Sequence, residues 1–226
     1  MTCGAVIPAA GQARRFGNGD KTVTHLCDRP VLEWSLRAMI EAGDLHQIVV
    51  VVSDENQFQV IDLITSLQSP IPISTARGGA LRMDSVRAGI DALDPACELV
   101  LIHDAARPLV TPDLIRDTIA AGRTHGAAIP STPVTDTIKR IDNEVVMGTV
   151  DRSELAAVQT PQVFRREWLM HAYSALPSGR EATDESSILE IAGYPVHIVP
   201  GDSTNIKLTE SSDVAIAEAL LREREA

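Results

Sequence analysis

The chain has 226 residues, of which 44% are hydrophobic and 23% are charged, and it carries a formal net charge of −11. This length suits a single α/β domain, and we expect one domain over residues 1–226. The acidic balance and the lack of a Lys/Arg-rich run argue against a nucleic-acid partner, whereas a small phosphorylated ligand is compatible because a few cations can gather in one cleft.

The first half of the chain alternates short β-rich runs with amphipathic stretches. The run QIVVVVS is continuously apolar, which is typical of a strand covered on both faces. We expect strands at residues 3–8, 47–53, 72–76 and 98–103, and helices at residues 31–43, 55–67, 83–93 and 112–126. This order predicts an α/β fold with a mainly parallel, doubly wound sheet, helices on both faces and right-handed crossovers.

The pattern changes after residue 131. The runs TDTIKRI and EVVMGTV flank an Asp142-Asn143 turn, which predicts an inserted hairpin, a β-arm at about residues 133–158. Its apolar side needs cover, so we expect it to pack on a partner subunit; the alternative is a hairpin folded back on its own domain. Later elements are expected as strands at residues 156–161, 194–200 and 205–209, and as helices at about 165–176, 184–192 and the C-terminus.

The stretch PAAGQARRFGNGDK follows the first predicted strand. Its small residues let a ligand approach the backbone, and Arg14, Arg15 and Lys21 can reach an anion. It lacks the GxGxxG and GxxxxGK[ST] patterns, which weakens the usual dinucleotide and ATPase interpretations. Because ligands of open parallel sheets bind outside the carboxyl ends of the strands, we interpret the stretch as a loop for a base, a sugar and phosphates. The alternative is a solvated basic loop.

The segment HDAARP leaves the predicted strand at residues 98–103. Asp104 is well placed there to hold a divalent cation or a sugar hydroxyl, and the Arg107 guanidinium can bind a phosphate. The alternative role for Asp104 is that of an N-cap or turn residue. His103 is interpreted as a packed residue at the strand end and not as a catalytic base.

The segment GGALRMDSV places a glycine pair before a helix start. The glycines permit close approach of a ligand to the backbone, and Ser85 and Arg82 can hydrogen-bond a base or a phosphate. Considered alone, the segment is also compatible with an ordinary junction between a loop and a helix.

Several common kinds of site and location are not expected. The three cysteines are far apart and form no CxxC pair, and the six histidines show no HExxH spacing, so neither a disulfide frame nor a zinc site is predicted. We find no apolar stretch long enough to span a membrane and no signal peptide, and we expect no membrane partner. Together these features predict a cytoplasmic protein.

Seven segments occur in a defined order: PAAGQARRFG…DK, GGALRMDSV, HDAARP, PVTDTIKR, TVDRSELAAVQTPQVF, ATDESSILE and NIKLT. They resemble the 2-C-methyl-D-erythritol 4-phosphate cytidylyltransferase family of the non-mevalonate isoprenoid pathway, over nearly the whole chain. The resemblance implies a Rossmann-like nucleotidyltransferase fold, CTP as co-substrate, a divalent metal (usually Mg²⁺) and a homodimer linked through the β-arm. It implies transfer of a cytidylyl group from CTP to 2-C-methyl-D-erythritol 4-phosphate, with release of pyrophosphate.

The resemblance also assigns expected roles to individual residues. The positions that form the backbone wall around cytidine in the family correspond here to Pro8, Ala9, Ala10 and Gly11. The positions that contact cytosine correspond to Gly79 and Ser85. Arg15 and Lys21 correspond to the family residues that hold the triphosphate, and Asp104 to the acid near the metal and ribose. The residues on the side of the substrate phosphate correspond to Arg107, Thr160 and Lys207. Residues that reach the partner's site are matched by Thr137 and Arg152. Arg15, Lys21 and Lys207 are the expected catalytic residues.

Two other functions are weighed against this one. Within the same family, D-ribitol 5-phosphate is the alternative acceptor, because two polyol phosphates differ little in what they require of a site. From another class, a non-catalytic nucleotide-binding regulatory protein predicts loss of the cationic residues, yet all five are present: Arg15, Lys21, Arg107, Arg152 and Lys207. A nicotinamide-dependent oxidoreductase ranks lower because GxGxxG is missing.

Overall fold

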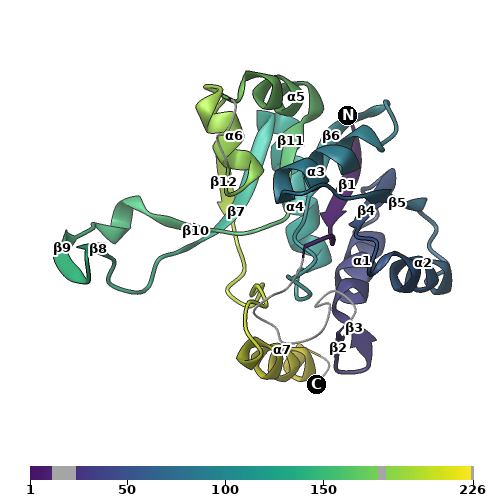
Figure 1. The fold of residues 1–226 in the computed structure, drawn as a ribbon, viewed down its shortest axis with the longest axis horizontal. Helices are drawn as coiled ribbons and strands as arrows, with labels where there is room; N and C mark the ends of the chain where they lie inside the picture. Colours follow the sequence, from purple (N-terminus) through teal and green to yellow (C-terminus); the bar gives the residue numbers. More distant parts are fainter. Residues whose placement is uncertain (12–23, 178–181, 225–226) are drawn as a thin grey trace.

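The structure is a computed structural model and describes residues 1–11, 24–177 and 182–224. Within these ranges, an eight-stranded sheet carries helices on both faces (Figure 1). Its strands are β1 (Thr2–Pro8), β4 (Gln47–Val52), β5 (Ile73–Arg77), β6 (Cys97–Ile102), β7 (Ala127–Pro133), β10 (Ala156–Val158), β11 (Gln162–Arg165) and β12 (His197–Pro200). Two short hairpins pair β2 (His25–Leu26) with β3 (Arg29–Pro30) and β8 (Lys139–Asp142) with β9 (Val145–Thr149).

In the first half of the chain the helices connect successive strands, as in a doubly wound fold. The helices are α1 (Val31–Ala42), α2 (Gln57–Ser66), α3 (Arg82–Asp91), α4 (Pro112–His125), α5 (Arg166–Ala175), α6 (Glu185–Ile191) and α7 (Ser212–Arg224), with a short 3₁₀ turn η1 (Arg152–Glu154). β6, β1, β4 and β5 are neighbours and pair in parallel. β12 also pairs in parallel with β7. The predicted α/β class and mainly parallel sheet are therefore confirmed.

The strand β11 was not predicted, and it runs antiparallel to both of its neighbours in the sheet, β6 and β7. The sequence analysis assigns a single strand to residues 156–161 and begins a helix near Arg165. In the structure β10 covers only the first three of these residues, and β11 follows as a separate antiparallel strand between β6 and β7. β11 is buried at Gln162, Val163 and Phe164, and its short apolar run gives no alternating signal of its own.

Two apolar layers sandwich the sheet, because alternate side chains of each strand point to opposite faces. Ala5 and Ile7 of β1 belong to the layer that includes α1, α2 and α4. Val6, between them, belongs to the layer that includes α3, α5 and α6. All three side chains are fully buried, so β1 is the central support for the loop that follows it.

The helix ends follow the local signals of the sequence. Thr111 caps α4, where its hydroxyl accepts a hydrogen bond from the Leu114 amide at 3.2 Å, and Pro112 occupies the first turn. Gly126 ends the same helix with φ +86°, a conformation that glycine adopts without a side-chain penalty. Gly43 ends α1 in the same way with φ +75°.

The strand expected at residues 205–209 (NIKLT) is absent: the structure describes this segment as an irregular stretch. The Leu208 amide donates to the Ala106 carbonyl at 2.8 Å instead of joining a ladder. The Leu208 side chain packs with Leu26 and with Ala217 of α7 in a third apolar cluster. The apolar residues of NIKLT therefore serve to hold the segment against the loop after β6.

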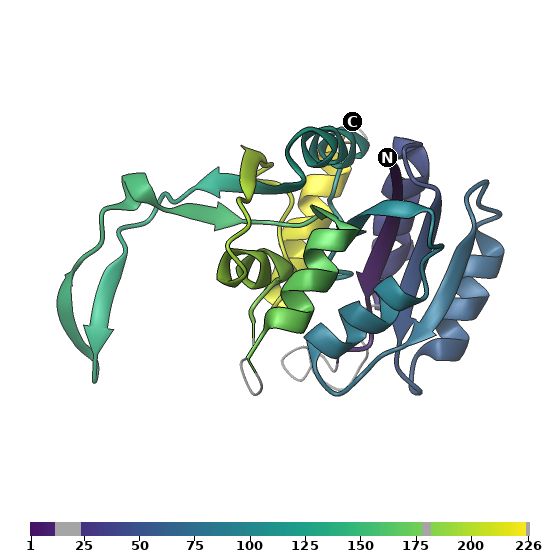
Figure 2. The ribbon, with the colours of Figure 1, turned by 90° about the horizontal axis from the view of Figure 1, so that it is seen from above.

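The predicted hairpin is present as β8 and β9, which pair with each other and project from the body as an arm (Figures 1 and 2). The positive φ angles fall at Asn143 and Glu144, so the turn lies one residue later than expected. Four apolar side chains of the hairpin are 58–66% exposed: Ile141, Val145, Val146 and Met147. Within the described ranges, no helix is long and apolar enough to cross a membrane.

Candidate active site

The predicted ligand-binding segments meet at the edge of the sheet where the parallel strands end. Residues 8–11 end β1 and begin the loop after it, Gly78 and Gly79 follow β5, and Asp104 lies two residues beyond β6. These strands are close neighbours in the sheet. Since ligands of open α/β sheets bind outside the carboxyl ends of the strands, this edge is the candidate active site.

The loop after β1 is held in place by its backbone. The Ala9 amide donates to the Val51 carbonyl at 2.8 Å, and its carbonyl accepts from the Asn56 side-chain amide at 2.9 Å. Pro8 and Ala10 are half-buried and Gly11 is exposed. The structure thus places the predicted cytidine wall at the site edge. The next predicted residues, Arg14, Arg15 and Lys21, lie outside the described residues.

The loops after β1 and β5 touch beside a hollow of about 220 Å³. A Cβ atom at Gly78 would overlap the Cβ of Ala10, and one at Gly79 would overlap the Cβ of Asp84. A side chain at Gly78 would push the two loops apart, and one at Gly79 would push the glycine pair away from the first turn of α3, which explains the two glycines. The hollow is lined by Ala10, Ser53, Asp54, Glu55, Arg77, Gly78 and Gly79.

Ser85 holds the glycine loop from below. Its side chain is buried, and its hydroxyl accepts from the Gly79 amide at 3.1 Å and donates to the Leu81 carbonyl at 3.1 Å. The structure therefore brings Gly79 and Ser85 together, but it uses the hydroxyl to shape the loop. Contact of Ser85 with cytosine stays a prediction.

Asp104 is the centre of the charged part of the site. Lys207 donates to its Oδ2 at 2.7 Å, and Arg82 donates to its Oδ1 at 3.2 Å. Burial works against the charged carboxylate, but Arg82 and Lys207 outweigh it and hold the pKa of Asp104 well below its usual range. Asp104 is therefore an ionised carboxylate with a fixed orientation, and the alternative of a simple turn or N-cap residue does not account for these pairs.

Lys207 and Arg82 differ in how open they are. The Lys207 side chain is 44% exposed, so its ammonium can meet a ligand as well as Asp104. Arg82 is the more enclosed of the two, and its other amino group donates to both oxygens of Glu185 at 2.8 and 2.9 Å. Burial alone would lower the pKa of Arg82, but Glu185 and Asp104 raise it further above its usual range. Arg82 is thus committed to two carboxylates.

His103 and Thr160 support Asp104 from within the protein. The Asp104 amide donates to the Thr160 hydroxyl at 3.0 Å, and that hydroxyl lies 3.1 Å from His103 Nδ1. His103 Nε2 lies 3.1 Å from the Arg107 carbonyl, which can only accept, so Nε2 carries the hydrogen and Nδ1 accepts from Thr160. Burial lowers the pKa of His103 to about 4. Because its ring is neutral and fully buried, His103 is a packed residue at the end of the strand, as predicted from the sequence.

Arg107 lies beside this group, half-buried. One of its amino groups donates to the Asn205 carbonyl at 2.7 Å, and the Asn205 side chain donates to the Thr160 carbonyl at 2.9 Å. The segment that carries Lys207 is thereby tied to the loop after β6. Arg107, Thr160 and Lys207 are brought together as predicted, and their contact with a substrate phosphate stays a prediction.

Thr137 and Arg152 are not brought to this site in their own chain. Both side chains are exposed on the arm, and Arg152 donates to the Thr135 carbonyl. The arm extends away from the sheet (Figure 2). The two residues can therefore meet an Asp104 centre only if they belong to another copy of the chain or if the arm moves.

Two polar side chains of the site were not predicted. Glu185 lies within the segment ATDESSILE, which was noted only as part of the family pattern, and Asn205 opens the segment NIKLT. Both are fully or almost fully buried. The available sequence signal was an acid directly after Asp184, the N-cap of α6, but an acid in a first helical turn is ordinary. Its partner, Arg82, lies 103 residues earlier and cannot be inferred from spacing.

The donor set bears on the expected metal. Among the described residues, no group of three or more His, Cys, Asp or Glu side chains is arranged to hold an ion. A protein-only cage is therefore not available there. Mg²⁺ is commonly held by one or two carboxylates together with substrate phosphates, and the single carboxylate of Asp104 fits that mode of binding.

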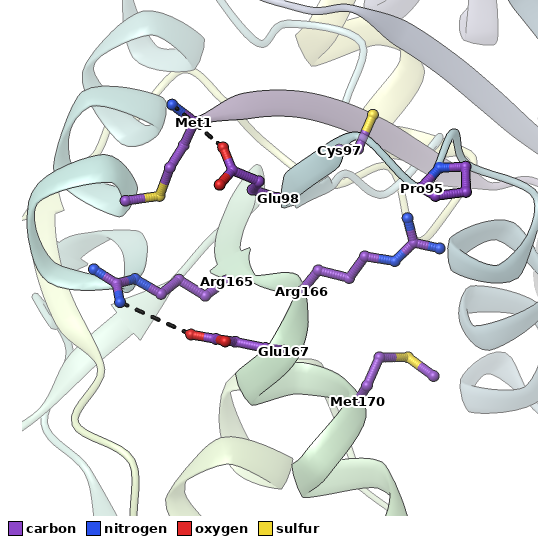
Figure 3. Close-up of a pocket in the computed structure, with 8 residues that line it drawn as sticks. All are labelled: Met1, Pro95, Cys97, Glu98, Arg165, Arg166, Glu167 and Met170. Atoms are coloured by element: carbon purple, nitrogen blue, oxygen red, sulfur yellow. Dashed lines mark ion pairs between the residues drawn. The ribbon is translucent and has the colours of Figure 1, made fainter.

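A larger hollow of about 430 Å³ lies at the opposite end of β1 and β6 (Figure 3). Its charged groups are engaged nearby: Glu98 pairs with the Met1 amino group at 3.5 Å, and Arg166 donates to the Asp94 and Ile90 carbonyls. The predicted site residues do not line it. Size alone therefore does not mark the site; the carboxyl edge combines small loops with a charged centre.

The sheet has small-residue loops and a charged centre at its carboxyl edge. These features are typical of Rossmann-like nucleotide-binding enzymes. The family model described as 2-C-methyl-D-erythritol 4-phosphate cytidylyltransferase (IspD) matches residues 3–223 of the chain. The chain therefore belongs to this family, and it is a cytidylyltransferase.

Individual relatives agree with this assignment. The chain is 41% identical over 223 residues to 2-C-methyl-D-erythritol 4-phosphate cytidylyltransferase of Thermosynechococcus vestitus, covering 97% of this chain and 95% of the relative. It is 40% identical over 220 residues to the enzyme of that name from Dehalococcoides mccartyi, covering 97% and 96%. The crystal structure of 4-diphosphocytidyl-2C-methyl-D-erythritol synthase from Anaerococcus prevotii has a TM-score of 0.86, 31% identity and 98% coverage of both chains.

Proposed function

We propose that this enzyme transfers a cytidylyl group from CTP to 2-C-methyl-D-erythritol 4-phosphate. The products are 4-diphosphocytidyl-2-C-methyl-D-erythritol and pyrophosphate, for isoprenoid precursor synthesis. The observation that carries the proposal is the Asp104 centre with Lys207 and Arg82, at the same sheet edge as the glycine-lined hollow. The names of the relatives support the choice of acceptor.

The chemical step joins two anions. A phosphate oxygen of the acceptor attacks the α-phosphorus of CTP, the new P–O bond forms, and the bond to the β-phosphate oxygen breaks as pyrophosphate leaves. The nucleophile is already ionised, so the reaction needs no general base, which agrees with a buried and neutral His103. The main tasks of the protein are to align the reactants and to stabilise the charge that develops on the phosphoryl oxygens.

The cations of the chain suit these tasks. In this proposal Arg15 and Lys21 hold the triphosphate, Lys207 neutralises charge near the α-phosphate, and Arg107 and Thr160 form the side of the acceptor phosphate. Asp104 would hold Mg²⁺ together with the triphosphate and would contact the ribose. When bound, the ion supplies additional positive charge to the triphosphate.

The arm is assigned to a second copy of the chain. Its exposed apolar side chains need cover, and in this proposal a homodimer provides it while the partner's Thr137 and the partner's Arg152 complete each site. We further propose that residues 1–226 form one cytidylyltransferase domain that carries the arm at about residues 133–158. A cytoplasmic location stays a prediction.

Pyrophosphate release tests the proposal. The enzyme with CTP and Mg²⁺ is compared on methylerythritol 4-phosphate and on ribitol 5-phosphate, with UTP and GTP in place of CTP as controls. A strong preference for CTP and for the branched phosphate is expected. Preference for ribitol 5-phosphate would keep the fold and the chemistry but contradict the acceptor, and no release with either would support a binding-only protein.

A further inference from the structure

A buried acid lies behind the charged centre, outside the set of groups assigned to substrates. Glu185 is the first residue of α6, and its side chain is 1% exposed. Both carboxylate oxygens accept from one amino group of Arg82, and Oε1 lies 3.4 Å from the Tyr173 hydroxyl. The other amino group of Arg82 donates to Asp104. One guanidinium therefore joins two carboxylates that come from different parts of the fold.

The geometry leaves Arg82 little freedom to turn. A guanidinium is planar, so fixing one amino group against Glu185 also fixes the direction of the second. That second group contacts Oδ1 of Asp104, while Lys207 contacts Oδ2. Each oxygen of Asp104 thus faces a different cation. The more enclosed cation is held from behind by Glu185, and the more exposed one can exchange with a ligand.

We propose that Glu185 is a positioning residue for the reaction: it anchors Arg82 so that Arg82 orients Asp104 without occupying both of its oxygens. This inference rests on the proposed function, in which Asp104 faces the divalent ion and the ribose. Without the charge of Glu185, Asp104 becomes the main partner of Arg82. The guanidinium can then bind Asp104 through both of its amino groups, and Asp104 becomes less available to an ion.

The test compares Glu185→Gln with the same substitution at Glu190, which lies on the same helix but is exposed. Groups that orient a metal-binding side chain typically change metal affinity or activity by about 10- to 100-fold when they are removed. We expect Glu185→Gln to weaken Mn²⁺ binding in the presence of CTP by at least ~10-fold, measured by electron paramagnetic resonance. We also expect a lower kcat, an almost unchanged KM for CTP and partial recovery in Glu185→Asp. Glu190→Gln should match the wild type.

A double variant separates positioning from simple stabilisation. Glu185→Gln leaves Arg82 buried beside a neutral partner and can reduce stability, so thermal unfolding is followed in parallel. Arg82→Gln/Glu185→Gln removes both charges, so that two neutral side chains face each other. Because Glu185 acts through Arg82, the Mn²⁺ affinity and kcat of the double variant should equal those of Arg82→Gln alone. Folded Glu185→Gln with wild-type Mn²⁺ affinity and kcat, or additive losses in the double variant, would overturn the inference. Since Mn²⁺ binding needs no acceptor, this result is independent of which acceptor is used.

Discussion

The Asp104 centre and the arm satisfy their side chains in opposite ways. Around Asp104, the acids are buried, Arg82 is half-buried and Lys207 is partly exposed, and these groups from the loop after β6, α3, α6 and the segment before α7 pair with one another. On the arm, apolar side chains such as Ile141 and Met147 are more than half exposed, and β8 and β9 pair with each other. The centre is therefore organised within one chain, whereas the arm is suited to a surface that lies outside it.

The largest expected effect concerns a cation of the centre. Lys207→Ala removes the ammonium that lies 2.7 Å from Asp104 and, in the proposed reaction, the charge near the α-phosphate. Turnover should fall by ~10² or more, as when a preorganised stabiliser of transition-state charge is lost. Lys139→Ala on the arm, where the ammonium contacts Thr149, should keep most of the activity. Equal losses in both variants would contradict the contrast between the two regions.

Stability should depend on pH through the centre. His103 has a pKa of about 4 when folded against an ordinary value of 6.5, because burial favours its neutral form. As the pH falls, the unfolded chain therefore binds the proton before the folded protein does. The free energy of unfolding decreases by about 3 kcal/mol between pH 6.5 and 4. Above pH 6.5 this contribution is fully present.

Chemical denaturation at several pH values measures this dependence. His103→Gln should be less stable at pH 7 but should show a shallower pH dependence than the wild type between pH 6.5 and 4. If the two proteins lose stability in parallel, His103 is not the group responsible.

A charge on the arm should affect assembly more than folding. Ile141→Asp places a carboxylate on a side chain that is 66% exposed, and Ile216→Asp places one on α7 at a side chain that is 52% exposed. If the arm packs on a second copy, Ile141→Asp should sediment as a monomer and lose activity at least ~10-fold in dilute solution. Ile216→Asp should stay dimeric and active. A dimeric Ile141→Asp protein would show that the arm surface is not the interface.

The smallest effect compares two caps. Thr111→Ala removes the hydroxyl that caps α4 in the body and should reduce the free energy of unfolding by about 1 kcal/mol. Asp151→Ala removes the cap of η1 on the arm, where local opening does not require the body to unfold. Denaturant titration should show no measurable change for Asp151→Ala, and an equal loss in both variants would mean that the arm folds together with the body.

Much of the fold was predictable because the signals were local. Continuous apolar runs marked β1, β4 and β6, and Thr111, Pro112 and Gly126 marked the ends of α4. The sequence of residues 205–209, NIKLT, resembles that of a short strand, although the structure has no strand there. Its backbone and Leu208 are instead used by the loop after β6 and by α7, which are contacts over long sequence distances.

The candidate site was predictable in part for a similar reason. Asp104 and the glycine pair follow predicted strands, so the carboxyl edge of the sheet could be inferred from their positions. The internal use of the Ser85 and Thr160 hydroxyls could not, because hydrogen-bond partners depend on how loops pack together. Glu185 required knowledge of a contact with Arg82 across 103 residues.

Subunit complementation tests most directly whether a centre in one chain is completed by the arm of another. Lys207→Ala disables the centre and Arg152→Ala disables the arm, so each purified variant should be almost inactive. After unfolding and refolding together, about half of the dimers are mixed, and each mixed dimer regains one intact site, which predicts about a quarter of the wild-type activity. A mixture as inactive as its components, although mixed dimers have formed, would contradict the account.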